Sequence, residues 1–446
     1  MNSGAVEIAI VGAGARFTPG LLLGLVGQPG LAGATVRLCD VNEERLNVVE
    51  QWARRLSEQY GGTYNVRATT SLKEALAGAQ FAISTVRAGG TAATKADLDI
   101  PARHGIEQGV ADTVGPGGLF FALRQIPALV EVAKTMEQAC PDAWLLTFSN
   151  PMTAMCRAVM RSSTTRCIGL CDGIFGRRKW VERYLGVPRD ELDVRHAGIN
   201  HMTWMTQLEH NGQDVYPALR QRKAGVGDQP ISFQLMDVFG LFPSPGDRHI
   251  AEFFPYFHRA DADGGRKYGL PTSVERWEQI SSWRVDYEAS LAAQAHGTQP
   301  LPEPNPSAGE GTLELIAYLA GAARPKPAGR RGDEGDPLAG IFAANLPNTR
   351  GYVPGLQEWA IVEGFARADA DGLHPLPPVE LPPAILNNLR GRLDQIELTV
   401  EAALTGNRQV ALQALATDPL VPSLEQARAI LDEALAAEAP YLPQFN

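Results

Sequence analysis

The sequence lacks the long apolar runs and the positive charge that would point to a membrane or to nucleic acid. No apolar stretch reaches about 18 residues, the length needed to cross a bilayer, so no membrane-spanning helix is expected. The 40 Lys and Arg residues are outnumbered by 50 Asp and Glu residues, which gives a formal net charge of −10. Because an acidic protein repels the phosphate backbone, nucleic acid is not expected as a partner.

Cysteine is scarce, and the first residues lack the charged and apolar segments of a secretory signal. The five cysteines are odd in number and all lie in the first half of the chain: Cys39, Cys140, Cys156, Cys167 and Cys171. Such a set favours reduced thiols over a disulfide framework. These absences predict a cytoplasmic protein in which a cysteine can serve as a metal ligand or a reactive group.

The first half of the chain alternates apolar, strand-like segments with helix-like segments. After the first strand, Thr18 and Pro19 form a typical helix start. The strand-like segments are residues 6–13, 36–41, 81–86, 143–150 and 166–173. Strands that alternate with helices predict an α/β fold with a doubly wound parallel sheet of the Rossmann type, which we assign to residues 1–195.

Beyond residue 195 the pattern changes. Residues 196–215 alternate as strands do, with a tight-turn dipeptide at Asn211–Gly212. Long helical stretches then continue to the end of the chain. We therefore expect residues 196–446 to form a mixed α/β domain with long C-terminal helices, which carries the substrate and metal site and the oligomer contacts.

A glycine-rich turn follows the first strand. Gly12 and Gly14 occupy the first two positions of a dinucleotide-binding fingerprint, and Phe17 replaces the third glycine. Glycines at this point let backbone N–H groups approach a pyrophosphate at a helix N-terminus. Asp40 ends the second strand, where its carboxylate can accept hydrogen bonds from a ribose diol and repels a 2′-phosphate. The pattern predicts NAD binding, with a merely structural turn as the alternative.

A long tract at residues 84–124 is rich in glycine and polar residues. Its composition predicts an extended loop across the carboxyl ends of the strands, where ligands bind in such sheets. The Gly-Gly pairs at 89–90 and 117–118 are typical of a backbone that lies close to a ligand. A surface excursion without a ligand is the alternative.

Two short segments carry candidate metal ligands. Cys171 and Asp172 end an apolar strand, and Asn200 and His201 follow later. A thiolate and an imidazole can hold a divalent cation, with sugar oxygens or water in the remaining positions. Two ligands are too few to identify a metal, and a buried cysteine with a hydrogen-bonded histidine explains the same residues.

Residues 243–257 concentrate titratable and aromatic side chains between Pro and Gly residues. Asp247, Arg248, His249 and Glu252 can all line a site. A solvated loop with an aromatic anchor explains the segment equally well.

Taken together, these segments resemble glycoside hydrolase family four, the NAD- and divalent-metal-dependent glycosidases, and the related NAD-dependent sulfoquinovosidases. The resemblance extends over most of the chain and rests on several short motifs in the same order. They are GAG at 12–14, DTVGPGGLFFALR at 112–124, FSNP at 148–151, GLCDG at 169–173, GINHMTW at 198–204, residues 344–364 and residues 405–421.

The resemblance implies a redox-elimination mechanism unlike the two-carboxylate scheme of most glycosidases. It implies that NAD oxidises C3 of the sugar and that a cation polarises the resulting ketone, which acidifies the C2 proton. A base removes that proton, the aglycone leaves C1 by elimination, water adds, and the hydride returns.

The resemblance also implies roles for individual residues. Cys171 and His201 match the metal ligands, usually for Mn²⁺. Asp172 matches the acid that protonates the leaving group in some members, a role that needs a raised pKa. His249 falls near the position of the base, and Tyr256 is the alternative base. The matched cofactor-binding residues are Gly12, Gly14, Ala15, Arg16, Phe17, Asp40, Arg45, Val86, Arg87 and Asn150, and the substrate-binding residues are Asn150, Asp172, Asn200 and Arg248.

The chain departs from the family pattern near the expected metal site. Its DTVGPGG tract is similar to the α-galactosidase and α-glucuronidase branch, but that branch commonly has His after the ligand cysteine, where this chain has Asp172. Residues 173–175 are GIF, which replaces the tripeptide of the phosphate-handling branches. The cations at 177–179, Arg248 and 266–267 suit an anionic C6 group, although solvated surface charges are the alternative.

We therefore expect a small-molecule glycoside as substrate, a sulfoquinovoside or uronide before a 6-phosphoglycoside. The resemblance implies a homodimer or homotetramer. A NAD-dependent sugar or hydroxy-acid dehydrogenase, which would accumulate NADH, is the alternative function, and a non-catalytic nucleotide sensor is a third.

Overall fold

The computed structural model describes residues 5–171, 173–222, 229–258, 260–305, 309, 311–323 and 340–445. Six parallel strands form the first part of its sheet, in the order β3-β2-β1-β4-β5-β6. Their bounds are β1 Glu7–Val11, β2 Ala34–Cys39, β3 Tyr64–Thr69, β4 Phe81–Ser84, β5 Trp144–Thr147 and β6 Arg166–Leu170. The central strands are buried along almost their whole length because helices cover both faces, and the predicted Rossmann-type parallel sheet is confirmed.

The same sheet continues with antiparallel strands from the second half of the chain. β11 pairs with β6, and the order then runs β11-β12-β7-β8-β10, with β9 on β8 and β13 on β12. The predicted Asn211–Gly212 turn joins β8 to β9, and both of its residues have positive φ. These strands are β7 Leu192–Ile199, β8 Met202–His210, β9 Gln213–Asp214, β10 Phe242–Pro243, β11 Ile341–Pro347, β12 Ile361–Asp369 and β13 Gly372–Pro375.

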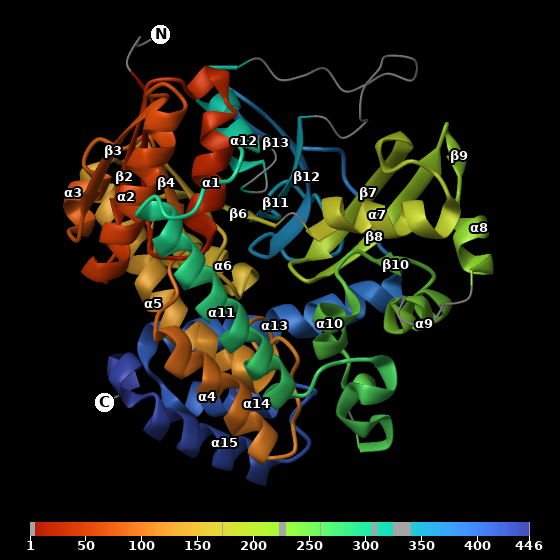
Figure 1. The fold of residues 1–446 in the computed structure, drawn as a ribbon. Coiled ribbons are helices and arrows are strands. Elements are labelled where there is room, and N and C mark those ends of the chain that lie inside the picture. Colours follow the sequence, from red (N-terminus) through yellow and green to blue (C-terminus); the bar gives the residue numbers. More distant parts are fainter. Residues whose placement is uncertain are drawn as a thin grey trace.

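The helices cover the sheet and form a layer at one end of it (Figure 1). Those of the first half are α1 Phe17–Val26, α2 Glu43–Gln59, α3 Leu72–Leu76, α4 Gly90–Arg103, α5 Gly115–Ala139, α6 Met152–Ser162 and α7 Gly173–Leu185. Those of the second half are α8 Tyr216–Gln221, α9 Pro230–Phe239, α10 Asp247–Ile250, α11 Ser273–Ala295, α12 Thr312–Leu319, α13 Pro383–Thr405, α14 Arg408–Ala416 and α15 Leu424–Ala437. Short 3-10 helices span Pro29–Leu31, Arg189–Glu191, Ala251–Phe253, Pro255–Phe257, Ala260–Tyr268, Ala439–Tyr441 and Pro443–Phe445.

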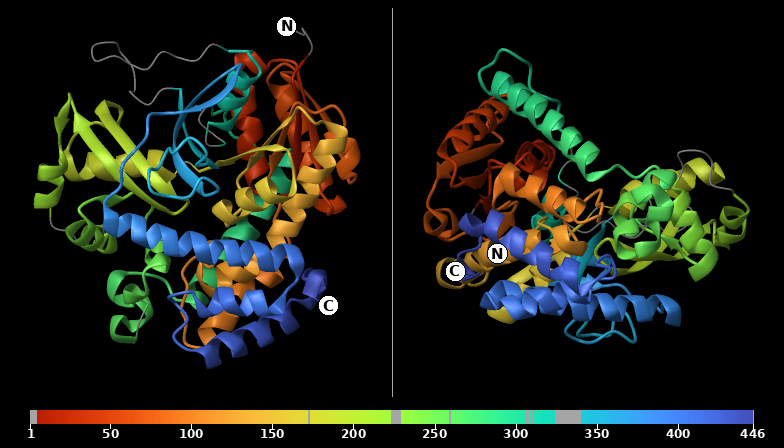
Figure 2. Two further views of the ribbon diagram at one scale, coloured as in Figure 1. Left: turned by 180° about the vertical axis from the view of Figure 1, so that it is seen from behind. Right: turned by 90° about the horizontal axis from the view of Figure 1, so that it is seen from below.

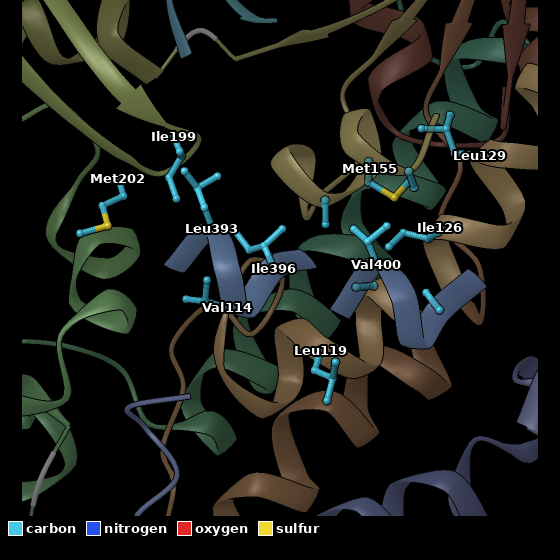
Figure 3. Close-up of a cluster of buried hydrophobic side chains, with 14 of the residues drawn as sticks. Val114, Leu119, Ile126, Leu129, Met155, Ile199, Met202, Leu393, Ile396 and Val400 are labelled. Carbon is cyan, nitrogen blue, oxygen red and sulfur yellow. The ribbon is translucent and has the colours of Figure 1, made fainter. Parts of the chain in front are cut away.

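The C-terminal helices pack against helices of the first half. α13 contacts α5 and α6, and α15 contacts α4 (Figure 2). Leu393, Ile396 and Val400 of α13 belong to one buried apolar cluster with Ile126 and Met155 (Figure 3). The predicted long C-terminal helices are therefore present and form a core with the first half. The division at residue 195 stays a prediction.

The long helix α11 begins at a capping box, in which Thr272 and Glu275 each bond to the other's backbone N–H. It contacts α2 and α4 of the first half. Within the described ranges, neither α11 nor any other helix has the length and apolar character needed to cross a membrane.

The prediction of an extended loop at residues 84–124 was wrong. α4 and the start of α5 occupy most of this tract, and only residues 104–114 connect them. Glycine usually weakens a helix interior, but these glycines lie at helix starts, and at two of them neighbouring backbone atoms leave no room for a Cβ. A Cβ on Gly117 would lie 2.6 Å from the carbonyl oxygen of Asp97, and one on Gly118 would lie 2.7 Å from the carbonyl carbon of Thr113.

Candidate active site

The carboxyl ends of β1, β2 and β4 meet at the glycine turn. The N–H groups of Gly12 and Ala13 donate to the carbonyl oxygen of Cys39. Gly12 has φ of +83°, and a Cβ there would lie 2.8 Å from the backbone nitrogen of Val86. No side chain fits between these strand ends, so they pack this closely only with glycine at position 12. The turn leads into the start of α1, which is where a pyrophosphate binds in dinucleotide-binding folds.

Asp40 fixes the second half of this turn. Its Oδ2 accepts a hydrogen bond of 2.8 Å from the N–H of Gly14, and its Oδ1 accepts one of 2.8 Å from the N–H of Asn42. A carboxylate oxygen has two lone pairs, so both oxygens can still accept a hydrogen bond from a ribose hydroxyl. Asp40 thus joins the glycine turn after β1 to the end of β2, and the role of these residues in NAD binding stays a prediction.

The remaining predicted cofactor residues surround this turn in different ways. Ala15 donates its N–H to the carbonyl oxygen of Gly12, and the exposed Arg16 follows it. The ring of Phe17 lies 4.5 Å from that of Phe148, measured between centroids. Arg45 forms an ion pair with Glu288 of α11, so in this structure it joins two helices.

Three further predicted cofactor residues follow β4 and β5. The Val86 carbonyl accepts a hydrogen bond from the hydroxyl of Ser149, the neighbour of the half-buried Asn150. Arg87 bonds to Thr94 through two nitrogens and lies over the ring of Phe121. Arg87 is exposed to solvent, yet desolvation by the surrounding protein lowers its pKa.

A second group of polar side chains comes together from three separate segments. Asp112 lies in the connection between α4 and α5, His201 in the β7–β8 turn and His249 in α10. One potential ligand atom from each lies within 4.8 Å of the other two, and the two imidazole centroids are 4.2 Å apart. One carboxylate oxygen and two imidazole nitrogens form a donor set that suits Mn²⁺ or a similar divalent cation.

Thr113 sets the tautomer of His201. Its hydroxyl lies 2.7 Å from Asp112 Oδ1 and 2.7 Å from His201 Nδ1. The carboxylate can only accept, so the hydroxyl donates to Asp112 and accepts from the Nδ1–H of His201. The Nε2 lone pair of His201 is therefore available to a cation, which is the usual arrangement of a metal-binding histidine.

The surroundings keep both imidazoles neutral. Burial lowers the pKa of His249 well below its ordinary value, and the neighbouring His201 and Arg248 lower it further. Burial also lowers the pKa of His201, against the opposing effect of Asp112. A neutral imidazole offers the lone pair that a metal ion or a proton needs. The backbone of His201 has φ of +62°, a conformation that non-glycine residues adopt at a cost and that is often found at functional sites.

Arginines surround this group. Arg177, Arg248 and Arg276 all act electrostatically on His249, and Arg276 comes from α11. Desolvation, together with Arg248, lowers the pKa of Arg276 to about 10. Arg248 makes neither an ion pair nor a hydrogen bond to any other part of the described structure, and its Nε is buried. An anion bound here would stabilise the desolvated guanidinium of Arg276 and its neighbouring cations.

The other predicted site residues lie as follows. Cys171 is half-buried at the end of β6 and packs against Met152, Cys156 and Ile361. It is not part of the Asp112–His201–His249 group, and its role as a metal ligand stays a prediction. Asp172 lies outside the described residues.

Asn200 and Tyr256 have very different exposures. Asn200 is 1% exposed, and its Nδ2 donates to Glu363 Oε2 over 2.8 Å. Tyr256 is 62% exposed. The predicted contact of Asn200 with a sugar and the alternative role of Tyr256 as the base stay predictions.

Sequence reasoning missed Asp112, Thr113 and Arg276. The first two stand in the DTVGPGG tract, where a polar pair directly before a glycine-rich helix start is a usable signal. Arg276 carries no local signal because it lies inside a regular helix far along the chain.

Comparisons with known proteins fit this geometry. The model of the family 4 glycosyl hydrolases matches residues 7–187, and the model of the C-terminal domain of that family matches residues 196–320 and 339–421. The chain belongs to glycosyl hydrolase family 4. It is therefore a glycosidase, and the dehydrogenase alternative receives no support.

Relatives within family 4 differ in substrate. The chain is 30% identical to an alpha-galactosidase of Bacillus subtilis (strain 168), over 99% of this chain and 100% of that protein. It is 29% identical to an alpha-galacturonidase of Thermoanaerobacterium saccharolyticum, over 98% of this chain and 96% of that protein. A 6-phospho-alpha-glucosidase from gut microorganisms, solved with NAD and Mn²⁺, has the same fold, with a TM-score of 0.82, 21% identity and coverage of 99% and 100% of the two chains.

Proposed function

We propose that this family 4 enzyme uses NAD and a divalent cation, Mn²⁺ by preference, to cleave a glycoside whose sugar carries an anionic group at C6. The observation that carries the proposal is the meeting of Asp112, His201 and His249 in one group of potential metal ligands. Arg87 links this group to the nucleotide turn, because its pKa responds both to Asp112 and to Arg16 of the turn. When bound, NAD supplies reversible hydride transfer and the cation supplies polarisation of a sugar oxygen.

The side chains of the group then have distinct tasks. Asp112 and the Nε2 of His201 hold the cation, with Cys171 as a further predicted ligand. We assign to His249 the removal of the C2 proton, because its lowered pKa keeps the imidazole neutral and its buried Nδ1 has no hydrogen-bond partner among the residues that the structure describes. Asp172 stays the predicted acid that protonates the leaving group.

The variant His249→Gln tests this assignment. We expect loss of turnover and of exchange of the C2 proton with deuterated solvent, while Mn²⁺ affinity measured by calorimetry stays that of the wild type. If Mn²⁺ affinity falls as far as turnover does, His249 is a metal ligand and another group removes the proton.

The nature of the anionic group follows from Arg248 and Arg276. Within the described residues neither guanidinium group pairs with a carboxylate. Both therefore suit a carboxylate or sulfonate of the substrate, which a guanidinium can bind through two parallel hydrogen bonds. The similarity to an alpha-galacturonidase supports a uronide. We therefore propose a uronide or a sulfoquinovoside as the substrate, ahead of a 6-phosphoglycoside.

A panel of paired α- and β-linked aryl glycosides distinguishes these candidate substrates. It contains uronides, sulfoquinovosides, 6-phosphoglucosides and neutral galactosides, each assayed with NAD and Mn²⁺ and then without each of them. The proposal predicts release of the chromophore without net NADH, with the best kcat/KM on a uronide or sulfoquinovoside. Preference for the neutral galactoside would refute the anionic substrate.

The variant Arg248→Gln tests from the side of the protein whether Arg248 binds the anionic group. Loss of one charge-assisted contact costs about 1.5–3 kcal/mol, which corresponds to a decrease of about 10- to 150-fold in kcat/KM on the anionic substrate. The exposed Arg408, paired with Asp432 on the surface, provides the control Arg408→Gln. An equal loss on neutral and anionic substrates would contradict the role of Arg248. Assembly as a homodimer or homotetramer and a cytoplasmic location stay predictions.

A further inference from the structure

The connection that carries Asp112 is folded around one buried carboxylate. Glu252 is 1% exposed, and its Oε1 accepts hydrogen bonds from the N–H groups of Val110, over 2.8 Å, and Ala111, over 3.1 Å. Its Oε2 accepts from the side-chain amide of Gln108 over 3.2 Å. Glu252 itself follows His249 in the 3-10 turn after α10. One side chain therefore joins the two segments that carry Asp112 and His249.

Gln108 extends this contact to the start of α5. Its Oε1 accepts from the N–H of Gly117 over 2.9 Å, and its Nε2 donates to the carbonyl oxygen of Val114 over 2.9 Å as well as to Glu252. The second half of the connection, from Gln108 to Val114, is thus held by the side chains of Glu252 and Gln108. Within it, Ala111 has φ of +56°, which a non-glycine residue keeps only when its surroundings hold it.

A second pair of charges holds the same two segments from the C-terminal helices. Arg392 of α13 donates to the carbonyl oxygens of Glu252, over 3.3 Å, and Phe253, over 3.1 Å. It also pairs with Asp418 over 2.9 Å, and Asp418 accepts from the N–H of Gly115 over 3.0 Å. Both charged groups are buried. The C-terminal helices therefore brace the fold around Glu252.

We propose that Glu252 is a positioning residue, which holds Asp112 and His249 at the separation at which a divalent cation and the C2 proton can be handled together. In this proposal Glu252 contacts neither the cation nor the substrate. It acts through the backbone of residues 110–111. This inference rests on the proposed function. Backbone N–H groups that lose a buried acceptor find another partner only if the chain moves, and such a movement would displace Asp112.

Two variants test the proposal without removing the whole side chain. Glu252→Gln keeps the volume, but its amide N–H₂ would face the amide of Gln108, so one of the two must give up its present contacts. Glu252→Asp keeps the carboxyl group, but the shorter side chain cannot reach both Val110 and Ala111 unless the connection shifts. Glu438→Gln is the control, since Glu438 is also 1% exposed but pairs with Arg124 of α5 and not with the backbone of residues 110–111.

The first readout is Mn²⁺ affinity, measured by calorimetry on the full-length protein with NAD present. We expect both variants at Glu252 to raise the Kd for Mn²⁺ by about 10- to 100-fold, as loss of the outer partners of a metal ligand does. Saturating Mn²⁺ should restore part of kcat, and the Kd of the Glu438→Gln protein should equal that of the wild type. A role only in stability would lower the melting temperature of all three variants and leave the Kd unchanged.

The second readout needs no metal. Hydrogen exchange of the Val110 and Ala111 amides in the metal-free protein should be faster in Glu252→Gln than in the wild type and in Glu438→Gln. If the wild type fails to bind Mn²⁺, the proposed function falls and this inference falls with it. If the wild type binds Mn²⁺ and both variants bind it equally well, or if amide exchange is unchanged, the positioning role of Glu252 is refuted while the proposed function stands.

Discussion

Replacement of Thr113 by valine is a sharp test of the cation site. The two side chains have nearly the same shape, so Thr113→Val removes the hydroxyl and little else. In the structure this hydroxyl connects Asp112 Oδ1 to His201 Nδ1, with 2.7 Å on each side. Without it, the proton of His201 can move to Nε2, and the lone pair that would bind the cation is lost.

The expected magnitudes differ between stability and binding. Thr113 is half-buried, so water can replace its hydroxyl, and the free energy of unfolding should fall by only about 1 kcal/mol. Water does not fix the tautomer of His201 in the same way. The Kd for Mn²⁺ should therefore rise by about 10- to 100-fold, or about 1.4–2.7 kcal/mol.

The assay is calorimetric titration of Mn²⁺ into the wild type and the variant, together with urea unfolding of both. Thr135→Val is the matched control, because the exposed hydroxyl of Thr135 bonds only to the carbonyl oxygen of Glu131 within α5. A Thr113→Val protein that binds Mn²⁺ as tightly as the wild type would refute the hydrogen-bond relay and the choice of Nε2 as the ligand atom.

Two further predictions concern the cofactor turn and the response to pH. Gly12→Ala should weaken NAD binding by at least about tenfold while Mn²⁺ binding persists, because Gly12 has φ of +83° and the new Cβ would collide with Val86. Fluorescence titration with NAD measures the affinity. An unchanged affinity would contradict a close approach of this backbone to NAD. Burial raises the pKa of Glu363 from 4.5 to about 7, so the folded state holds its proton more tightly than the unfolded chain does. The contribution of Glu363 to stability is then fully present below pH 4.5 and is lost as the pH rises through 7, by about 3 kcal/mol as an upper estimate. Urea unfolding of the wild type and Glu363→Gln at pH 5 and pH 8 measures the free energy of unfolding, which should be higher in the variant than in the wild type at pH 8. An equal change in the free energy of unfolding between the two pH values in both proteins would show that Glu363 does not titrate in this range.

The parts of the fold that depend on local sequence could be predicted. The apolar runs that end in the glycine turn and in Asp40 gave the parallel sheet and the nucleotide turn, because each signal lies within one strand and its following loop. The antiparallel hairpin could be read from Asn211–Gly212 for the same reason. The sequence motifs likewise placed the chain in its family.

The cation site depends on distant contacts, and the sequence shows less of it. Thr113 and His201 are 88 positions apart, and only the packing of the β7–β8 turn on the α4–α5 connection brings them together. The glycines of residues 84–124 were misread because their close neighbours, such as Asp97, come from another helix. The sequence also gives no sign that the side-chain amide of Asn200 donates a hydrogen bond to the buried Glu363.

The unbroken sheet restricts how a substrate can enter. Strand β6 bonds to β11, and β12 bonds to β7, so backbone hydrogen bonds pass from the nucleotide-binding strands to those that carry His201. An opening between the two family-matched regions would have to break the hydrogen bonds between β6 and β11, each of which contributes about 0.5–1.5 kcal/mol. We therefore expect the sugar to enter and the aglycone to leave through small displacements of short segments, such as α10 and the 3-10 turns after it, while the sheet keeps its structure.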